Sequence, residues 1–173
     1  MVIWLIGISG AGKTTLGNKI NNHLKSNGKK CSIIDGDEVR KFYNNDLGYS
    51  KNDRISNIKR IMLSVYFLEK NDIISIVCNI SPFQFLRDFA REKFNDYNEI
   101  YLQKNIQIAK KNDIKEIYKN NLNKTSIVGI DLNFEQPKNS DITINVDNES
   151  EEESFQKIID YINKKLEKDV FKI

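Results

Sequence analysis

A glycine-rich loop between an apolar run and a helical segment constrains this chain more than any other feature. Residues 7–14 read Gly-Ile-Ser-Gly-Ala-Gly-Lys-Thr. They follow the apolar run Val2–Ile6 and precede residues 13–25, where apolar side chains recur every four positions. Glycines let backbone amides turn inward around a phosphate, and the helix N-terminus adds a favourable dipole. The pattern G-x-x-x-x-G-K-[ST] in this setting predicts a nucleoside triphosphate site.

Individual residues of this loop have distinct expected roles. Lys13 is expected to reach the β- and γ-phosphates as a catalytic residue. The Thr14 hydroxyl is expected to ligate Mg²⁺, the cofactor that accompanies ATP. The complete set of expected phosphate contacts is Gly7, Ser9, Gly10, Ala11, Gly12, Lys13, Thr14 and Thr15.

The order of apolar segments predicts the fold class. Strand-like runs alternate with amphipathic helical segments, which is typical of a parallel sheet covered on both faces. We therefore expect a single-domain α/β protein over residues 1–173, with a mainly parallel five-stranded sheet flanked by helices. A polar stretch with few core anchors, about 105–126, is expected to form a small lid. The expected strands are 2–6, 31–34, 73–80, 98–102 and 141–146, and the expected helices are 13–25, from about 51 onward, 83–94 and 151–168.

Composition and charge limit the classes of partner that the protein is expected to bind. The formal charge of +3 suits a small anionic substrate and gives no sign of a nucleic-acid partner. No apolar run is long enough for a membrane span, and the start of the chain lacks the layout of a signal peptide. We expect a cytoplasmic protein with neither nucleic acid nor membrane as a partner. Cys31 and Cys78 lie in separate apolar runs and are expected to be buried free thiols.

The loop alone does not separate kinases from other users of nucleoside triphosphates. Switch GTPases typically carry an N-K-x-D sequence, whereas Asn123-Lys124 is followed here by Thr125-Ser126. At 173 residues the chain is also short for a motor. A kinase of small molecules is the favoured class.

Charged residues after the second predicted strand indicate an acceptor site. Asp35-Gly36-Asp37 stands at the edge where open α/β sheets bind ligands, and a carboxylate there can accept a proton or hold Mg²⁺. The alternative is an Asp-Gly turn with a helix cap. Arg40 and Arg54 are suited to hold a phosphate or sulfate by bidentate hydrogen bonds. Arg60 is either a third such residue or an exposed helix charge.

Several motifs in register together resemble the adenylyl-sulfate kinase family, whose members transfer the γ-phosphate of ATP to the 3′-hydroxyl of adenylyl sulfate. The resemblance covers roughly residues 2–147. Its motifs are Gly7–Thr15, Asp35-Gly-Asp-Glu-Val-Arg40, Leu47-Gly-Tyr-Ser50 with Asp53, Arg54 and Asn57, and Ser81-Pro82 with Arg87 and Arg91.

This resemblance implies roles for individual residues. Asp35 corresponds to the catalytic carboxylate of the family, and Tyr49 falls where the family has a phenylalanine that stacks on the acceptor base. Ile127 falls where the family has a second aromatic wall. The implied acceptor-binding residues are Asp37, Arg40, Tyr49, Arg54, Asn57, Ser81, Lys115 and Ile127.

The second half of the chain departs from the family pattern. Residues 112–118 read N-D-I-K-E-I-Y where the family has R-D-P-K-G-L-Y, and residues 127–130 read I-V-G-I where it has F-T-G-I. The main interpretation is a nucleotide 3′-hydroxyl kinase whose acceptor has changed, as in a related branch that acts on cytidine diphosphoramidate in capsule modification. The alternative is a genuine adenylyl-sulfate kinase of sulfate assimilation.

Two other classes of function also fit parts of the sequence. A non-catalytic nucleotide-binding module would need the loop but not Asp35, Arg40 and Arg54 together. A kinase of a non-nucleotide metabolite would have little use for Tyr49 as a stacking face. ATP and a small nucleotide acceptor are the expected ligands, and a homodimer is compatible with the sequence.

Overall fold

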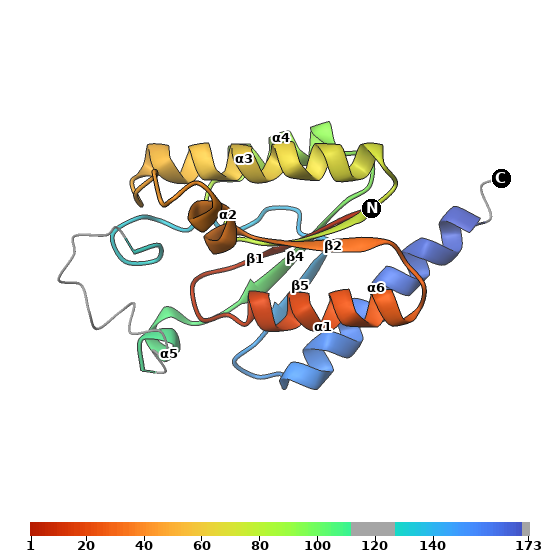
Figure 1. The fold of residues 1–173 in the computed structure, drawn as a ribbon. Coiled ribbons are helices and arrows are strands. Elements are labelled where there is room, and N and C mark those ends of the chain that lie inside the picture. Colours follow the sequence, from red (N-terminus) through yellow and green to blue (C-terminus); the bar gives the residue numbers. More distant parts are fainter. Residues whose placement is uncertain (112–126, 171–173) are drawn as a thin grey trace.

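The computed structural model of the protein describes residues 1–111 and 127–170. Strands and helices alternate along the chain, as Figure 1 shows, and the predicted α/β class is confirmed. The elements are β1 Val2–Ile6, α1 Lys13–Ser26, β2 Cys31–Asp35, α2 Gly36–Phe42, α3 Lys51–Lys70, β3 Ile74–Cys78, α4 Gln84–Lys93, β4 Tyr97–Gln103, α5 Ile106–Lys111, β5 Ile142–Asn145 and α6 Glu151–Val170.

The five strands form one parallel sheet in the order β2-β3-β1-β4-β5. Strand β1 lies at the centre, where Val2 is opposite both Ser75 of β3 and Tyr97 of β4. Every residue of β1 is 1% exposed or less. Burial on both faces explains why this strand is a continuous apolar run rather than an alternating one.

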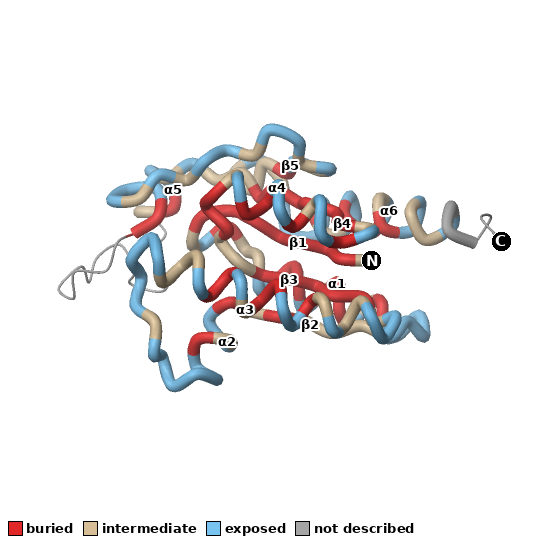
Figure 2. The backbone as a smooth tube through the Cα atoms, turned by 90° about the horizontal axis from the view of Figure 1, so that it is seen from above, coloured by how far each residue is buried: buried red, intermediate tan, exposed pale blue. Residues whose placement is uncertain are grey.

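Two layers of helices cover the sheet (Figure 1). Helices α1 and α6 lie on one face, and α3 and α4 lie on the other. Successive residues of β1 serve opposite faces, because Trp4 belongs to the core under α3 and α4 while Ile3 and Leu5 belong to the core under α1 and α6. Figure 2 shows that the buried backbone is concentrated in the strands and that the connection between α2 and α3 is mostly exposed.

Because all strands run in the same direction, their carboxyl ends meet at one edge of the sheet. The loops that follow β1 and β4 gather at this edge, on the left of Figure 1, together with α2, which follows β2 directly, and α5. Open α/β sheets bind ligands at such an edge. The glycine-rich loop after the central strand therefore lies where a ligand would be expected.

The structure refines several sequence-based expectations. Helix α2 was not predicted as a separate element. On α3, the apolar residues Ile58, Ile61, Met62 and Val65 are buried. Of the polar segment 105–126, only its first part is described, and α5 forms there.

Two further expectations concern the state of the cysteines and the absence of a membrane span. Both cysteines are free, as predicted; Cys78 is buried, but Cys31 is only partly so. Burial raises the pKa of the Cys78 thiol to about 12, with a further contribution from the negative charge of Asp35. Across residues 1–111 and 127–170, no helix is long and apolar enough to span a membrane.

Candidate active site

The backbone of the glycine-rich loop requires glycine at several positions. Gly7, Gly10 and Gly12 adopt φ angles of 144°, 78° and 86°, which side chains disfavour. A Cβ on Gly7 would also come within 2.5 Å of the Leu102 carbonyl oxygen on β4. Helix α1 begins at Lys13, so its N-terminus, where backbone N–H groups lack partners within the helix, adjoins the loop. The loop thus has the backbone form of an anion-binding turn.

Two side chains at the start of α1 contact groups around the loop. The Lys13 Nζ donates hydrogen bonds to the carbonyls of Gly7 (2.9 Å) and Ile8 (2.8 Å), so the ammonium group lies against the loop. The Thr14 hydroxyl donates to Asp35 Oδ2 at 2.7 Å. Of the other predicted phosphate contacts, Ala11 is buried, Ser9 and Gly12 are half-buried, and Gly10 and Thr15 are exposed.

Asp35 lies at the end of β2 and serves as the N-cap of α2. Its Oδ1 accepts the backbone N–H of Asp37 at 2.8 Å, while its Oδ2 accepts the Thr14 hydroxyl. The capping alternative is therefore confirmed. The same carboxylate also adjoins the phosphate loop, which is the placement that a role in the site requires. Asp37 is exposed on α2.

Arg40, Tyr49 and Arg54 form a second group, from α2, the following loop and α3. The Tyr49 ring centroid lies 4.8 Å from the Arg40 guanidinium carbon and 5.3 Å from that of Arg54. Arg40 also donates to the carbonyls of Leu47 (3.2 Å) and Gly48 (2.7 Å). Burial, and then repulsion from Arg40, lowers the pKa of Arg54. Two positive charges close to one aromatic ring favour an anionic ligand with a planar group.

Asn57 on α3 contacts the backbone of Gly36, the residue after Asp35. Its side chain is 1% exposed and donates to the Gly36 carbonyl at 3.1 Å. Its Oδ1 has no hydrogen-bond partner among the described residues. A Cβ at Gly36 would lie 2.1 Å from Asn79 Nδ2, so this glycine fits closely between side chains. The sequence did not indicate Asn79.

Ser81 has an unusual backbone and a fully engaged side chain. Its φ angle is +48°, which is uncommon for a residue other than glycine and can mark a functional site. The hydroxyl accepts from Trp4 Nε1 (2.9 Å) and donates to Asn79 Oδ1 (3.1 Å). Its carbonyl accepts from Arg87 Nη1 at 2.7 Å. Since the side chain is 1% exposed, its contacts hold the loop after β3 in place.

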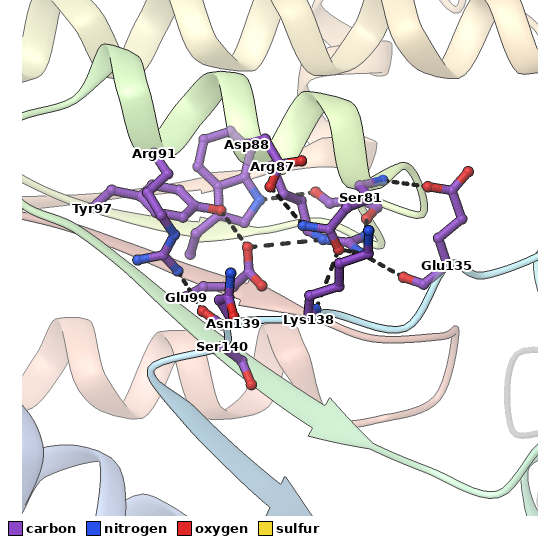
Figure 3. A network of polar contacts seen from close by, with 12 residues as sticks. Ser81, Arg87, Asp88, Arg91, Tyr97, Glu99, Glu135, Lys138, Asn139 and Ser140 are labelled. Atoms are coloured by element: carbon purple, nitrogen blue, oxygen red, sulfur yellow. Dashed lines mark hydrogen bonds and ion pairs between the residues drawn. The ribbon is translucent and has the colours of Figure 1, made fainter.

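Figure 3 shows how Arg87 joins this loop to the segment that precedes β5. Arg87 donates from Nη2 to Gln84 Oε1 and to the Glu135 carbonyl, both at 2.6 Å, and its Nε lies 3.9 Å from Glu99 Oε2. Tyr97 donates its hydroxyl to Glu99, and burial raises the pKa of this carboxyl. The spacing of Arg87 from Ser81 was noted in the sequence, but its buried partners were not predictable from it.

The last predicted acceptor residues follow β4. Ile127 is 4% exposed, and its N–H donates to Asp131 Oδ2 at 2.8 Å. It begins a turn in which a Cβ on Gly129 would lie 3.0 Å from Ile106 and 3.7 Å from Ile8, so the turn packs against the phosphate loop. Lys115 lies outside the described residues, as does the remainder of the predicted lid over 112–126. Arg60, the open case in the sequence, forms a bidentate ion pair with Asp46, with both distances 2.7 Å.

The site combines a glycine-rich loop after the central strand of a parallel sheet with a lysine and a threonine at the start of the following helix. A carboxylate contacts that threonine. Together these features define a P-loop kinase. Comparison with known proteins gives the family. The family model described as adenylylsulphate kinase matches residues 1–145, and the chain belongs to this family. It is an ATP-dependent phosphotransferase that acts on a nucleotide hydroxyl.

Individual relatives support this assignment. The adenylyl-sulfate kinase of Halothermothrix orenii is 35% identical over 167 residues, which are 95% of this chain and 90% of the relative. That of Picosynechococcus sp. is 35% identical over 161 residues, or 92% and 91% of the two chains. The APS kinase CysC of Mycobacterium tuberculosis, solved in complex with AMPPNP and APS, superimposes with a TM-score of 0.86 at 29% identity, covering 94% of this chain and 96% of that one.

Proposed function

We propose that this protein transfers the γ-phosphate of ATP to the 3′-hydroxyl of adenylyl sulfate. The observation that carries the proposal is the 2.7 Å hydrogen bond between Thr14 and Asp35. It brings the phosphate-binding loop, which would hold the donor, into contact with the carboxylate that would act on the acceptor. A module that only bound a nucleotide would not need this carboxylate and the Arg40–Arg54 pair together.

On the donor side, the proposed ATP phosphates lie on the loop from Gly7 to Thr14. The N-terminus of α1 and the Lys13 ammonium would neutralise part of their charge. The Thr14 hydroxyl supplies an oxygen, the ligand type that Mg²⁺ prefers, so this residue fits the ion that accompanies ATP. Mg²⁺ bound there would neutralise charge that develops on the phosphates.

A magnesium site of this kind needs few protein ligands. The described part of the chain contains no group of three or more His, Cys, Asp or Glu suited to hold a metal ion. Magnesium in kinases commonly keeps several waters and takes one or two protein ligands together with substrate phosphates. We infer that Thr14 serves in that capacity, with Asp37, two residues after Asp35 on α2, as an additional charge.

On the acceptor side, we propose that Arg40 and Arg54 hold the anionic middle of the nucleotide. Guanidinium groups match phosphate and sulfate oxygens in pairs, and these two are close enough for Arg40 to lower the pKa of Arg54. An anionic ligand would relieve this repulsion. The partly exposed ring of Tyr49 would offer a face to the acceptor base, and Asn57 would act by holding the Gly36 backbone next to Asp35.

For the transfer itself, Asp35 is the proposed base. The 3′-hydroxyl oxygen attacks the γ-phosphorus, the bond from this phosphorus to the bridging oxygen breaks, and ADP leaves with the electron pair. The proton of the hydroxyl passes to the Asp35 carboxylate. The hydrogen bond from the Asp37 N–H orients this carboxylate for the reaction.

Further contributions are proposed for residues around this centre. Ser81 would act through the backbone of its loop, because its hydroxyl is bonded to Trp4 and Asn79. The proposed lid, residues 105–126, would exclude water that could otherwise hydrolyse ATP. It begins with α5, whereas Lys115, proposed to approach the transferring phosphate, lies outside the described residues.

The choice of adenylyl sulfate over a cytidine-based acceptor is supported by the named relatives. Both are adenylyl-sulfate kinases, and this chain matches them over nearly their whole length. The changed-acceptor interpretation depended on Ile127 as an altered wall for the base. Because Ile127 is 4% exposed, it offers little surface to a base of either size in this conformation. No feature of the described residues favours cytidine diphosphoramidate.

An acceptor panel tests the proposal directly. ADP release and the phosphorylated product should be measured with adenylyl sulfate, with cytidine diphosphoramidate and without acceptor. We expect adenylyl sulfate to give the highest kcat/KM and a product phosphorylated at the 3′ position. Preference for cytidine diphosphoramidate would overturn the acceptor assignment. Loss of ATP consumption with every acceptor would instead favour a non-catalytic nucleotide-binding module.

A further inference from the structure

Asn79, which follows β3, has a side chain that contacts two segments of the site at once. Its Oδ1 accepts hydrogen bonds from the Ser81 N–H at 2.9 Å and from the Ser81 hydroxyl at 3.1 Å. Because a backbone N–H can only donate, this end of the carboxamide must be the oxygen. The other end, Nδ2, faces Gly36, the residue between Asp35 and Asp37. The carboxamide thus joins the loop after β3 to the first turn of α2.

The contact between Gly36 and Asn79 is too close for a side chain on residue 36. A Cβ on Gly36 would lie 2.1 Å from Nδ2 and 3.2 Å from Cγ of Asn79, and its three nearest atoms all belong to this asparagine. Gly36 does not have a positive φ angle, so its backbone alone would accept alanine. Alanine would also favour the helix that begins here. Glycine is therefore required by Asn79 rather than by the turn.

The side chain of Asn79 cannot easily move away from Gly36. It is short, and its Oδ1 is held by both donors of Ser81. A shift of Nδ2 would lengthen these hydrogen bonds and loosen the hold on Ser81, whose φ angle of +48° is sustained by the surrounding contacts. A change at Gly36 is thus transmitted to the loop after β3.

The backbone around Asn79 is anchored to the strand that leads into the phosphate loop. The Asn79 N–H donates to the Leu5 carbonyl of β1 at 3.2 Å, and the Gly7 N–H donates to the Ile80 carbonyl at 3.5 Å. The start of the Asn79 side chain is therefore fixed relative to the phosphate loop. Its far end limits how closely the first turn of α2 can approach.

We propose that Asn79 is a positioning residue, which fixes the Asp35 carboxylate in the place relative to the phosphate loop that phosphoryl transfer requires. Its carboxamide packs against Gly36, while Asn57 of α3 donates to the Gly36 carbonyl at 3.1 Å. Held between two asparagines, this glycine sets where Asp35 meets Thr14. Asn79 acts through the backbone of Gly36 rather than on the substrate. The inference rests on the proposed function, because Asp35 is the proposed base.

A double-mutant cycle between Gly36 and Asn79 tests this role. Gly36→Ala should lower kcat with adenylyl sulfate by about 10–100-fold, because a misplacement of about 1 Å can cost a hundredfold. Asn79→Ala should lower kcat by about tenfold, since the carboxamide no longer holds α2. In the Asn79→Ala background, Gly36→Ala should cost about threefold or less, because the clashing atoms are gone and the Cβ of residue 79 is 3.6 Å away. Losses that multiply in the double variant would overturn the proposal.

The KM for ATP separates positioning from general damage to the site. It should change by about twofold or less in both single variants, because the backbone hydrogen bond from Asn79 to Leu5 is untouched. A rise in this KM as large as the fall in kcat would contradict the proposal. Asn71→Ala is the matched control. Asn71 is exposed at the end of α3 and donates to the Phe67 carbonyl at 2.8 Å, so its loss should leave kcat unchanged.

Thermal melting of the same variants gives a readout that does not need activity. Gly36→Ala should lower Tm in the wild-type chain. In the Asn79→Ala background it should leave Tm unchanged or raise it, since alanine favours a helix once the clash is removed. If melting follows this pattern but the wild-type chain consumes no ATP with any acceptor, the proposed kinase function fails and the contact stands. If turnover is present and the changes in Tm simply add, the contact is refuted and the kinase proposal stands.

Discussion

The donor and acceptor sides of the candidate site are constructed differently. The donor side is one continuous stretch, residues 7–15, whose form is fixed by glycine φ angles and by the start of α1. The acceptor side combines residues from α2, the loop before α3, α3 itself and the loop after β3. A function that depends on local backbone geometry can be read from a short motif. Recognition by side chains from distant segments depends on how the whole fold brings them together.

The largest expected effect is on the donor side. Lys13→Ala should lower kcat/KM by on the order of a thousandfold or more, because the ammonium is proposed to stabilise charge on the transferring phosphate. ADP release measures activity, and circular dichroism should report an unchanged fold. Lys19→Ala is the control, since Lys19 pairs with Glu151 and Glu152 at the surface and should leave activity unaltered. Wild-type turnover by Lys13→Ala would contradict the donor assignment.

The link between the two sides should show the next largest effect. Asp35→Asn keeps an oxygen that can cap α2 but loses the proposed base, so kcat should fall by about 10²–10⁴. Thermal melting should change little, because the capping hydrogen bond remains available. Asp37→Asn, at an exposed position on the same helix, should cost much less. Equal losses in both variants would mean that the base had been assigned to the wrong carboxylate.

A smaller and more selective effect is expected on the acceptor side. Arg54→Gln should raise the KM for adenylyl sulfate by about 10–100-fold and leave the KM for ATP unchanged, because a charge-assisted hydrogen bond contributes about 1.5–3 kcal/mol. Arg60→Gln removes the surface ion pair with Asp46 and should alter neither KM. An equal rise in the KM for adenylyl sulfate and the KM for ATP in Arg54→Gln would contradict the assignment of Arg54 to the acceptor side alone.

Much of the fold was predictable because the strands are continuous apolar runs. The expected boundaries of β1 agree with the structure, and those of the other four strands differ by two residues or fewer. Helix α2 was not predicted because it is short and lacks apolar periodicity. The only sequence feature that indicated it was Asp35 as a possible helix cap. The phosphate loop was recognisable because its backbone requirements restrict residue type at fixed spacings.

The contacts across the site were less accessible to sequence reasoning. Thr14 and Asp35 follow strands that are not neighbours, since β3 separates β1 from β2 in the sheet. Their hydrogen bond depends on the packed fold rather than on any local pattern. Trp4 appeared only as part of an apolar strand, and its indole N–H proved to hold Ser81. A polar atom on a core residue finds its partner through tertiary structure.

The central position of β1 also has a consequence for how the chain folds during synthesis. This strand is made before both of its neighbours in the sheet, because Val2 pairs with Ser75 and Tyr97, which emerge much later. The non-local pairings are expected to slow folding, and the early part of the chain must keep its apolar strand uncovered until then. The nucleotide loop can therefore take a fixed position only after β4 has left the ribosome. Ligand binding by a nascent chain is thus expected to be a late event.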